Sequence, residues 1–153
     1  MKVYVIYDTK YGNTKAAAES VLAGIKEVAG FETDIGYVNE VDPEKAAGYD
    51  ALVLGAPNHM ARPSRAMTKF VDRLAAVKVK AKSVAVFGTY SGSARSDRAV
   101  KKLELTVKKK FPGVNLVSSG LSVRVRGIPG PVVEGELPKC VEYGRTLANL
   151  LKK

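Results

Sequence analysis

The chain has 153 residues, of which 46% are hydrophobic and 26% are charged, and this ordinary globular balance excludes a disordered chain. Its length predicts one domain over residues 1–153 with a substantial hydrophobic core. The formal net charge of +10, from 25 Lys and Arg against 15 Asp and Glu, is unusual and suits an acidic partner, nucleic acid or an anionic membrane surface.

The first half of the chain alternates apolar runs with a helix-period segment. Residues 3–7 (VYVIY) are apolar throughout, which predicts a strand covered on both faces. A helix is expected from Asn13, and Gly30 is placed to end it. Residues 31–38 alternate and predict a less protected strand, whereas residues 50–56 again predict a buried one.

The same alternation continues to the end of the chain. The expected elements are a helix from near Pro63, a strand over 83–88, a helix from about Ser96 to Phe111, a strand over 114–118 that continues toward residue 125, a Pro- and Gly-rich loop over 126–138, and a closing helix from Lys139. Strands that alternate with helices predict a parallel sheet covered on both faces. Ligands of such sheets bind at the carboxyl ends of the strands, here the loops 8–14, 55–62 and 88–95.

The first of these loops, within YDTKYGNT (residues 7–14), has the groups that a phosphate needs. Thr9 and Thr14 offer hydroxyl donors, Gly12 allows close backbone approach, and the following helix presents free N–H groups and a positive dipole end. The spacing is neither that of a nucleotide-triphosphate P-loop nor that of a dinucleotide turn. The loop alone fits an anion site and an ordinary capped turn equally.

A longer sequence pattern that includes this loop favours the anion site over the ordinary turn. Its members are Val5, Ile6, Tyr7, Thr9, Gly12, Thr14, Ala18 and Val21, and their spacing is that of the flavodoxin signature. The chain therefore resembles the flavodoxin family, in particular the compact flavodoxin-like domains of archaeal and bacterial flavoproteins. LGAPNHMARP (residues 54–63) and FGTYSG (87–92) extend the resemblance in the same order. It implies a three-layer, doubly wound α/β fold with five parallel strands in the order 2-1-3-4-5.

The resemblance also implies flavin mononucleotide (FMN) as a non-covalent cofactor and electron transfer as the function. It assigns the phosphate to Thr9, Lys10, Tyr11, Gly12, Asn13 and Thr14. It places Pro57, Asn58, His59, Met60, Ala61 and Arg62 along one face of the isoalloxazine. It places Thr89, Tyr90, Ser91 and Gly92 at the pyrimidine end, with Tyr90 as a stacking ring.

Other chemistries find little support in the residues. His59 is the only histidine, so a metal site and a Ser-His-Asp hydrolase are both disfavoured, and no catalytic residue is assigned. Cys140 is the only cysteine, which excludes an internal disulfide and suits the cytoplasm. No apolar segment suggests a membrane span, and the lysine clusters lack interleaved aromatic residues, so a nucleic-acid binder ranks last.

Three features depart from the family pattern. The chain is basic, it lacks Trp, and it has Ala61 where a glycine often allows a peptide to turn toward the flavin. His59 or Met60 would take the place of a stacking Trp. Positive charge at Lys10, Lys15, Arg62 and Arg65 predicts a less negative potential for the final reduction of the flavin, and the basic surface predicts an acidic partner.

Three functions remain open on the sequence. The first is an FMN-binding carrier that shuttles electrons between redox proteins in the cytoplasm. The second is an FMN-dependent reductase that acts on a quinone or another small oxidant with a nicotinamide cofactor. The third is a flavin-free binding module on the same fold.

Overall fold

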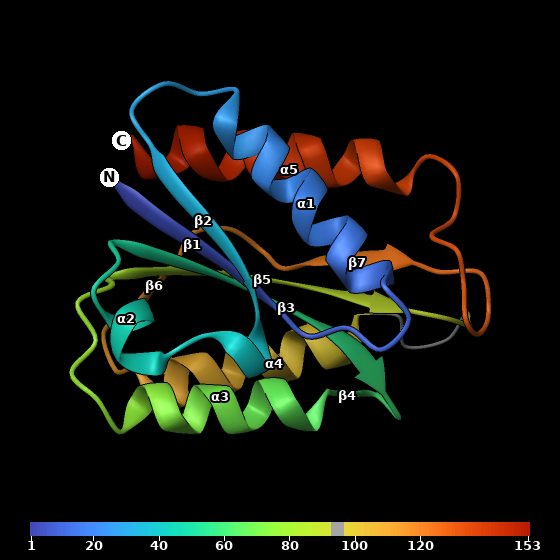
Figure 1. Cartoon of the computed structure of the whole chain (residues 1–153), viewed down its shortest axis with the longest axis horizontal. Helices are drawn as coiled ribbons and strands as arrows, with labels where there is room; N and C mark the ends of the chain where they lie inside the picture. The colour runs from blue at the N-terminus through green and yellow to red at the C-terminus, as the bar shows by residue number, and fades with distance from the viewer. Residues whose placement is uncertain (93–96) are drawn as a thin grey trace.

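The structure is a computed structural model, and it describes residues 1–92 and 97–153. A twisted parallel sheet runs through its centre (Figure 1). The strands are β1 (Lys2–Tyr7), β2 (Glu32–Tyr37), β3 (Ala51–His59), β4 (Arg62–Pro63), β5 (Ser83–Tyr90), β6 (Asn115–Leu116) and β7 (Leu121–Arg124). The sheet order is β2-β1-β3-β5-β6, β7 also pairs with β5, and β4 pairs antiparallel with the end of β3.

Helices cover both faces of the sheet (Figure 1). One layer consists of α1 (Asn13–Lys26) and α5 (Glu136–Leu151), and the other consists of η1 (Val38–Glu40), α2 (Pro43–Ala47), α3 (Arg65–Ala75) and α4 (Arg98–Lys110). Because β1, β3 and β5 are buried on both faces, they need the continuous apolar runs that they have. Within residues 1–92 and 97–153 no helix is both long and apolar enough to cross a membrane.

The predicted fold class is confirmed. The three layers, the parallel pairing and the order 2-1-3-4-5 are those expected, with β5 as the fourth strand and β6 and β7 together as the fifth. The closing helix begins three residues earlier than expected, at Glu136. The predicted start of the preceding helix at Ser96 lies outside the described residues, and the described helix runs over Arg98–Lys110.

The fifth strand is interrupted, which the sequence did not predict. Tyr143 of α5 donates its hydroxyl hydrogen toward the carbonyl oxygens of Val86 and Ser119, at 3.1 and 3.2 Å. The Ser119 carbonyl, which lies between β6 and β7, is thus bonded to the helix layer, and the pairing with β5 is interrupted there. Burial raises the pKa of Tyr143, so the phenol remains a neutral hydrogen-bond donor.

The helix expected from Pro63 begins two residues later. Pro63 lies in β4, and Ser64 precedes α3, where its hydroxyl accepts a hydrogen bond from the backbone N–H of Met67 at 3.4 Å. The inward face of α3 is the expected one, with Met67, Phe70, Val71 and Leu74 all buried. The later start of α3 leaves Arg62 and Pro63 free to pair with the end of β3 as a hairpin.

Two glycines allow α1 and α5 to pack closely. A Cβ atom on Gly24 of α1 would overlap the backbone of Val141, and one on Gly144 of α5 would overlap the backbone of Val21. The contact is reciprocal, so each helix offers a glycine to the other. It holds the C-terminal half of α1 against α5, while the N-terminal end of α1 directly follows the first predicted site loop.

This contact gives the first prediction. Gly144→Ala should lower the free energy of unfolding by about 2–3 kcal/mol, because the methyl group forces the two helix backbones apart. Gly48→Ala is the matched control, since its Cβ would lie 3.5 Å from the Lys45 carbonyl oxygen, an ordinary contact. The control should change stability by less than about 1 kcal/mol, in the stabilising direction. Urea unfolding of both variants measures this, and equal stabilities would refute the close-packing account.

Candidate functional site

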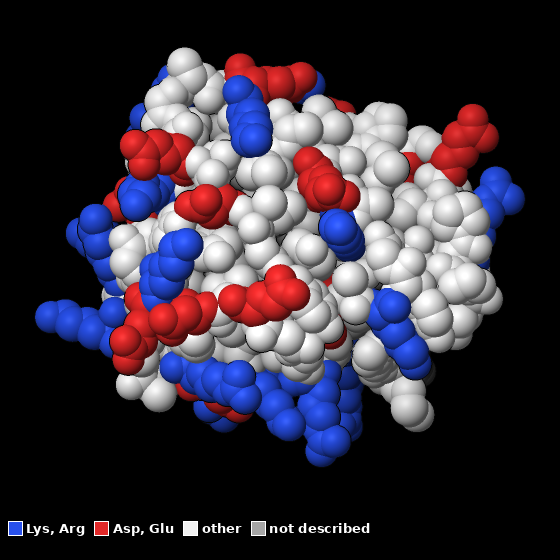
Figure 2. All heavy atoms as spheres, in the orientation of Figure 1, with Lys and Arg blue, Asp and Glu red and all other residues white. Residues whose placement is uncertain are grey.

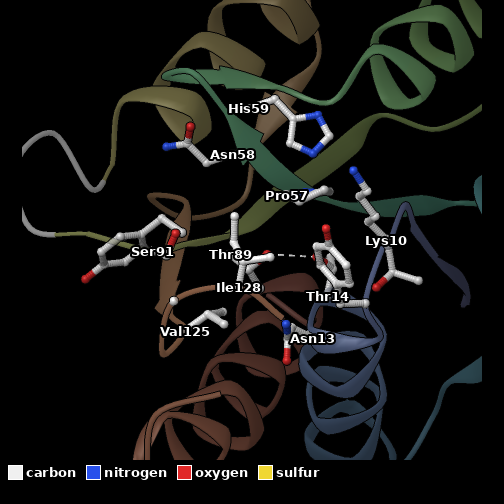
Figure 3. A pocket seen from close by; sticks show the side chains of 14 residues that line it. Lys10, Asn13, Thr14, Pro57, Asn58, His59, Thr89, Ser91, Val125 and Ile128 are labelled. Carbon is white, nitrogen blue, oxygen red and sulfur yellow. Dashed lines mark hydrogen bonds between the residues drawn. The ribbon is translucent and has the colours of Figure 1, made fainter. Parts of the chain in front are cut away.

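A pocket opens at the carboxyl ends of β1, β3, β5 and β7, with a cavity volume of about 170 Å³. Its lining side chains come from four segments that are far apart in the sequence (Figure 3). They are Thr9, Lys10, Tyr11, Asn13 and Thr14 from the first, Pro57, Asn58 and His59 from the second, Thr89, Tyr90 and Ser91 from the third, and Val125, Gly127 and Ile128 from the fourth. Parallel pairing brings these four strand ends to one edge of the sheet.

The first loop is shaped by its own backbone. The N–H of Asp8 donates to the carbonyl of Gly55 at 2.9 Å, which ties the start of the loop to β3. Gly12 then adopts a left-handed conformation (φ 90°), and its N–H donates to the Thr9 hydroxyl oxygen at 2.9 Å. The Thr9 hydroxyl hydrogen thus stays available to a ligand.

The start of α1 adds positive potential to this loop. No acidic side chain lies in the first turn of α1, so the free N–H groups there are not neutralised locally. Lys10 also lines the pocket, and its ammonium lies 5.4 Å from the centre of the Tyr11 ring. Both the helix end and the lysine favour a negatively charged group in this part of the pocket.

Two hydrogen bonds join the first loop to the others. The hydroxyl groups of Thr14 and Thr89, which are 1% and 5% exposed, lie 2.8 Å apart, as the dashed line in Figure 3 marks. The Asn13 side-chain amide donates to the carbonyl of Pro129 at 2.7 Å. These contacts hold the loops after β1, β5 and β7 in fixed positions relative to one another. The amide hydrogen that Asn13 gives to Pro129 is not available to a ligand.

The end of β3 and β4 form a hairpin next to the pocket. His59 pairs with Arg62, and Asn58 pairs with Pro63. Met60 and Ala61 lie at the tip with φ values of 54° and 66°, the pattern of a type I′ turn. The Asn58 side chain accepts a hydrogen bond from the Ala61 N–H at 2.7 Å. The sequence suggested that Ala61 would resist positive φ, yet the structure places it there, in a conformation that costs a non-glycine residue about 1–2 kcal/mol.

Most of the residues assigned from the resemblance come together in this pocket. The exceptions are Gly12, Met60, Ala61, Arg62 and Gly92, which are not among its lining residues. Gly12 shapes the first loop through its backbone, and Met60 is 96% exposed at the hairpin tip. Arg62 lines a separate groove with His59. Of the four cations expected near the flavin, Lys10 lines the pocket, Arg62 and Arg65 line that groove, and Lys15 lines neither.

The sequence assignment missed the fourth wall of the pocket. Val125, Gly127 and Ile128 follow β7, and Ile128 is 75% exposed. The rule that drew attention to the other loops applies here as well, because 126–138 follows the last parallel strand and is rich in Pro and Gly. The apolar side chains of Val125 and Ile128 supply a surface suited to a flat, apolar ring.

Other reactive groups lie elsewhere or are inert. Cys140 is fully buried between α5 and the sheet, and burial raises its pKa to about 12, so the thiol is not a nucleophile near neutral pH. Among residues 1–92 and 97–153, no group of His, Cys, Asp and Glu side chains is arranged to hold a metal ion. The groups that line the pocket are hydroxyl, amide, aromatic and apolar groups together with the Lys10 ammonium.

Comparison with known proteins points to one family. A family model for a flavodoxin domain matches residues 4–117. A flavodoxin of Aquifex aeolicus is 41% identical over 71 residues, which cover 46% of this chain and 38% of that protein. An NAD(P)H dehydrogenase (quinone) of Chromohalobacter salexigens is 26% identical over 126 residues, which cover 69% of this chain and 63% of that protein. The chain thus spans less than two thirds of the length of either relative.

Solved structures share the fold over the whole chain. Oxidised Flavodoxin 1 from Bacillus cereus matches with a TM-score of 0.80 at 21% identity, over 97% of this chain and 98% of that chain. A flavodiiron core from Synechocystis matches with a TM-score of 0.79 at 21% identity, over 99% of this chain and 36% of that chain. The same architecture therefore occurs both as a whole protein and as part of a larger one.

The hairpin geometry gives the second prediction. Ala61→Gly should raise the free energy of unfolding by about 0.5–1 kcal/mol, because relief of the positive φ outweighs the added entropy of the unfolded chain. Ala23→Gly, at an exposed position in the interior of α1, makes the same chemical change at a helical position and should lower stability by about 1 kcal/mol. Thermal unfolding distinguishes the two. If both variants lose stability, Ala61 does not have positive φ in solution.

Proposed function

The chain belongs to the flavodoxin domain family, and from this membership we propose that it binds FMN in the pocket at the strand ends and passes electrons between other redox proteins. One observation supports this most strongly. The loop that carries the family signature folds around a left-handed Gly12, directly before the N-terminus of α1, and it lines a pocket with apolar surface on its far side.

The residues present fit the parts of FMN. The phosphate suits the Thr9 hydroxyl, Lys10 and the backbone N–H groups at the start of α1, because these supply donors and positive charge with no acidic residue in the first turn. The isoalloxazine suits the wall formed by Pro57, His59 and Tyr90 together with Ile128. FMN supplies the redox chemistry, since it accepts and returns one or two electrons.

The other residues assigned to the FMN site hold the loops of the pocket in place. Thr14 and Thr89 hold the loops after β1 and β5 together through their buried hydroxyl pair. Asn13 holds the loop after β7 through its bond to Pro129. The hairpin keeps Asn58 and His59 at the mouth of the pocket, and Gly92 (φ 93°) turns the chain after the third wall. Tyr11 and Ser91 complete the lining.

A second candidate function is an FMN-dependent reductase that takes electrons from a nicotinamide cofactor and gives them to a quinone. It is favoured by the similarity to proteins named NAD(P)H dehydrogenase (quinone), which extends over 69% and 82% of this chain at 26% identity. Steady oxidation of NADPH by a quinone, with FMN but no other protein added, would select this function. If turnover requires a separate reductase, the carrier function stands.

A third prediction concerns FMN itself. The apo chain should bind FMN more tightly than riboflavin, because the first loop recognises the phosphate. Thr9→Ala should weaken FMN binding about 10-fold, the loss expected for one hydrogen bond to a charged group, and leave riboflavin binding unchanged. Thr106→Ala, a matched change on α4 outside the pocket, should affect neither. Fluorescence titration measures all six affinities. If the titration shows no FMN binding, the proposed function is wrong and the chain is a flavin-free binding module.

A fourth prediction concerns the potential. Lys10 lines the pocket, and its positive charge stabilises reduced flavin in the anionic form. Lys10→Gln should therefore make the final reduction potential more negative, by roughly 40 mV for about 1 kcal/mol of lost interaction with one electron. Lys26→Gln, at the far end of α1, removes the same charge and should shift the potential by less than about 10 mV. Equal shifts in a redox titration would rule out a local effect.

A further inference from the structure

A second groove lies beside the flavin pocket. It runs between β4, the start of α3 and one side of α4, and its volume is about 680 Å³. It is lined by His59, Arg62, Pro63, Arg65, Thr68, Lys102, Leu105 and Thr106. His59 also lines the flavin pocket, so the groove and the pocket share a wall.

The groove is strongly basic. Arg62, Arg65 and Lys102 line it, and none of the ion pairs between described residues includes any of the three. Their charges are therefore not neutralised by a neighbouring carboxylate of the described chain. The N-terminus of α3, at Arg65, adds the positive end of its dipole to the same place.

The helices around the groove also carry a positive net charge. Helix α3 carries three basic residues and one acidic residue, a net charge of +2, and α4 carries six basic residues and one acidic residue, a net charge of +5. Helices α1 and α5 on the other face together carry four basic and three acidic residues, a net charge of +1. Figure 2 shows basic side chains gathered along the edge over α3, whereas both signs mix over the rest of the visible face.

Apolar groups accompany the charge. Leu105 lines the groove and is 67% exposed, and Met60 at the hairpin tip is 96% exposed. Lys102, Leu105 and Thr106 are spaced so that they share one side of α4. Exposed Arg, Met and Leu side chains together are typical of a protein interface, where apolar contacts hold a partner that charge has attracted.

We propose that this groove docks the acidic surface of a redox protein and places that protein's redox centre beside the flavin, across the wall formed by His59. The proposal rests on the proposed function, because it needs a flavin in the neighbouring pocket. It deepens that function by naming the surface and the charge of the partner. Positive charge steers an acidic protein toward the groove, and Leu105 and Met60 add contact after encounter.

The test uses an acidic [2Fe–2S] ferredoxin, reduced with dithionite, as the probe partner. Each ferredoxin gives one electron as one iron passes from Fe²⁺ to Fe³⁺. Two ferredoxins together reduce one flavin, which takes its protons from solvent. Arg65→Gln/Lys102→Gln should lower the second-order rate constant about 10-fold at low ionic strength, and the loss should shrink below twofold at 0.5 M salt.

The matched control is Lys26→Gln/Lys152→Gln, which removes two charges at the opposite end of the molecule. It should lower the rate constant less than about twofold. The flavin potential is measured in every variant, so a change in driving force is corrected for. Equal losses in the two double variants, or no loss in either, would overturn the proposal.

A second variant tests the apolar part. Leu105→Asn should raise the dissociation constant of the ferredoxin about fivefold without changing its salt dependence, whereas Leu150→Asn on α5 should not change it. Calorimetry with the flavin-free chain measures this docking, so failure to bind FMN and failure of the groove are distinguishable. If the groove variants change the Michaelis constant for NADPH but not the ferredoxin rate or affinity, the groove binds a dinucleotide and the proposal is wrong.

Discussion

Parallel pairing of β1 with β3 is the constraint on which the site depends. The two strands are in register from Val3 and Ala51 to Tyr7 and Gly55, so β1 ends level with Gly55, while β3 continues to His59. One more backbone hydrogen bond follows the end of β1, from the Asp8 N–H to the Gly55 carbonyl. This bond fixes the point at which the first loop leaves the sheet. Because β5 continues the same register from β3, the Thr89 hydroxyl arrives within 2.8 Å of that of Thr14.

The sequence predicted the features that have strong local or periodic causes. Buried parallel strands need continuous apolar runs, and helices need one apolar side, so both could be identified without the structure. The loop proposed to bind the phosphate was recognisable because glycine and hydroxyl residues stand at fixed spacing around a helix start. The hairpin between β3 and β4 could not be predicted, since Met60 and Ala61 have no preference for positive φ. No sequence pattern indicates the Asn58 side-chain hydrogen bond or the pairing of β4. Between β6 and β7 the Ser119 carbonyl accepts a hydrogen bond from Tyr143, which lies more than twenty residues further on, and local sequence patterns do not predict such a contact.

The hairpin joins the two sites. Its first strand presents Asn58 and His59 to the pocket at the strand ends, where we propose that FMN binds, and its second strand presents Arg62 to the basic groove. The unfavourable backbone at its tip is tolerated because Asn58 pairs with the Ala61 N–H and Pro63 leads directly into the capped start of α3. The pocket and the groove are therefore next to each other, and this short hairpin contributes residues to both.

The contact between Asn13 and Pro129 has a consequence for how the protein is made. The two residues are 116 positions apart, and α1 and α5 pack together from opposite ends of the chain. A ribosome that adds about 5–20 residues per second would deliver the second partner roughly 6–23 s after the first. Through that interval Val21 and Ile25 have no helix to cover them, and the pocket lacks its last wall. A nascent chain is thus expected to complete this pocket only after the loop that follows β7 has been synthesised.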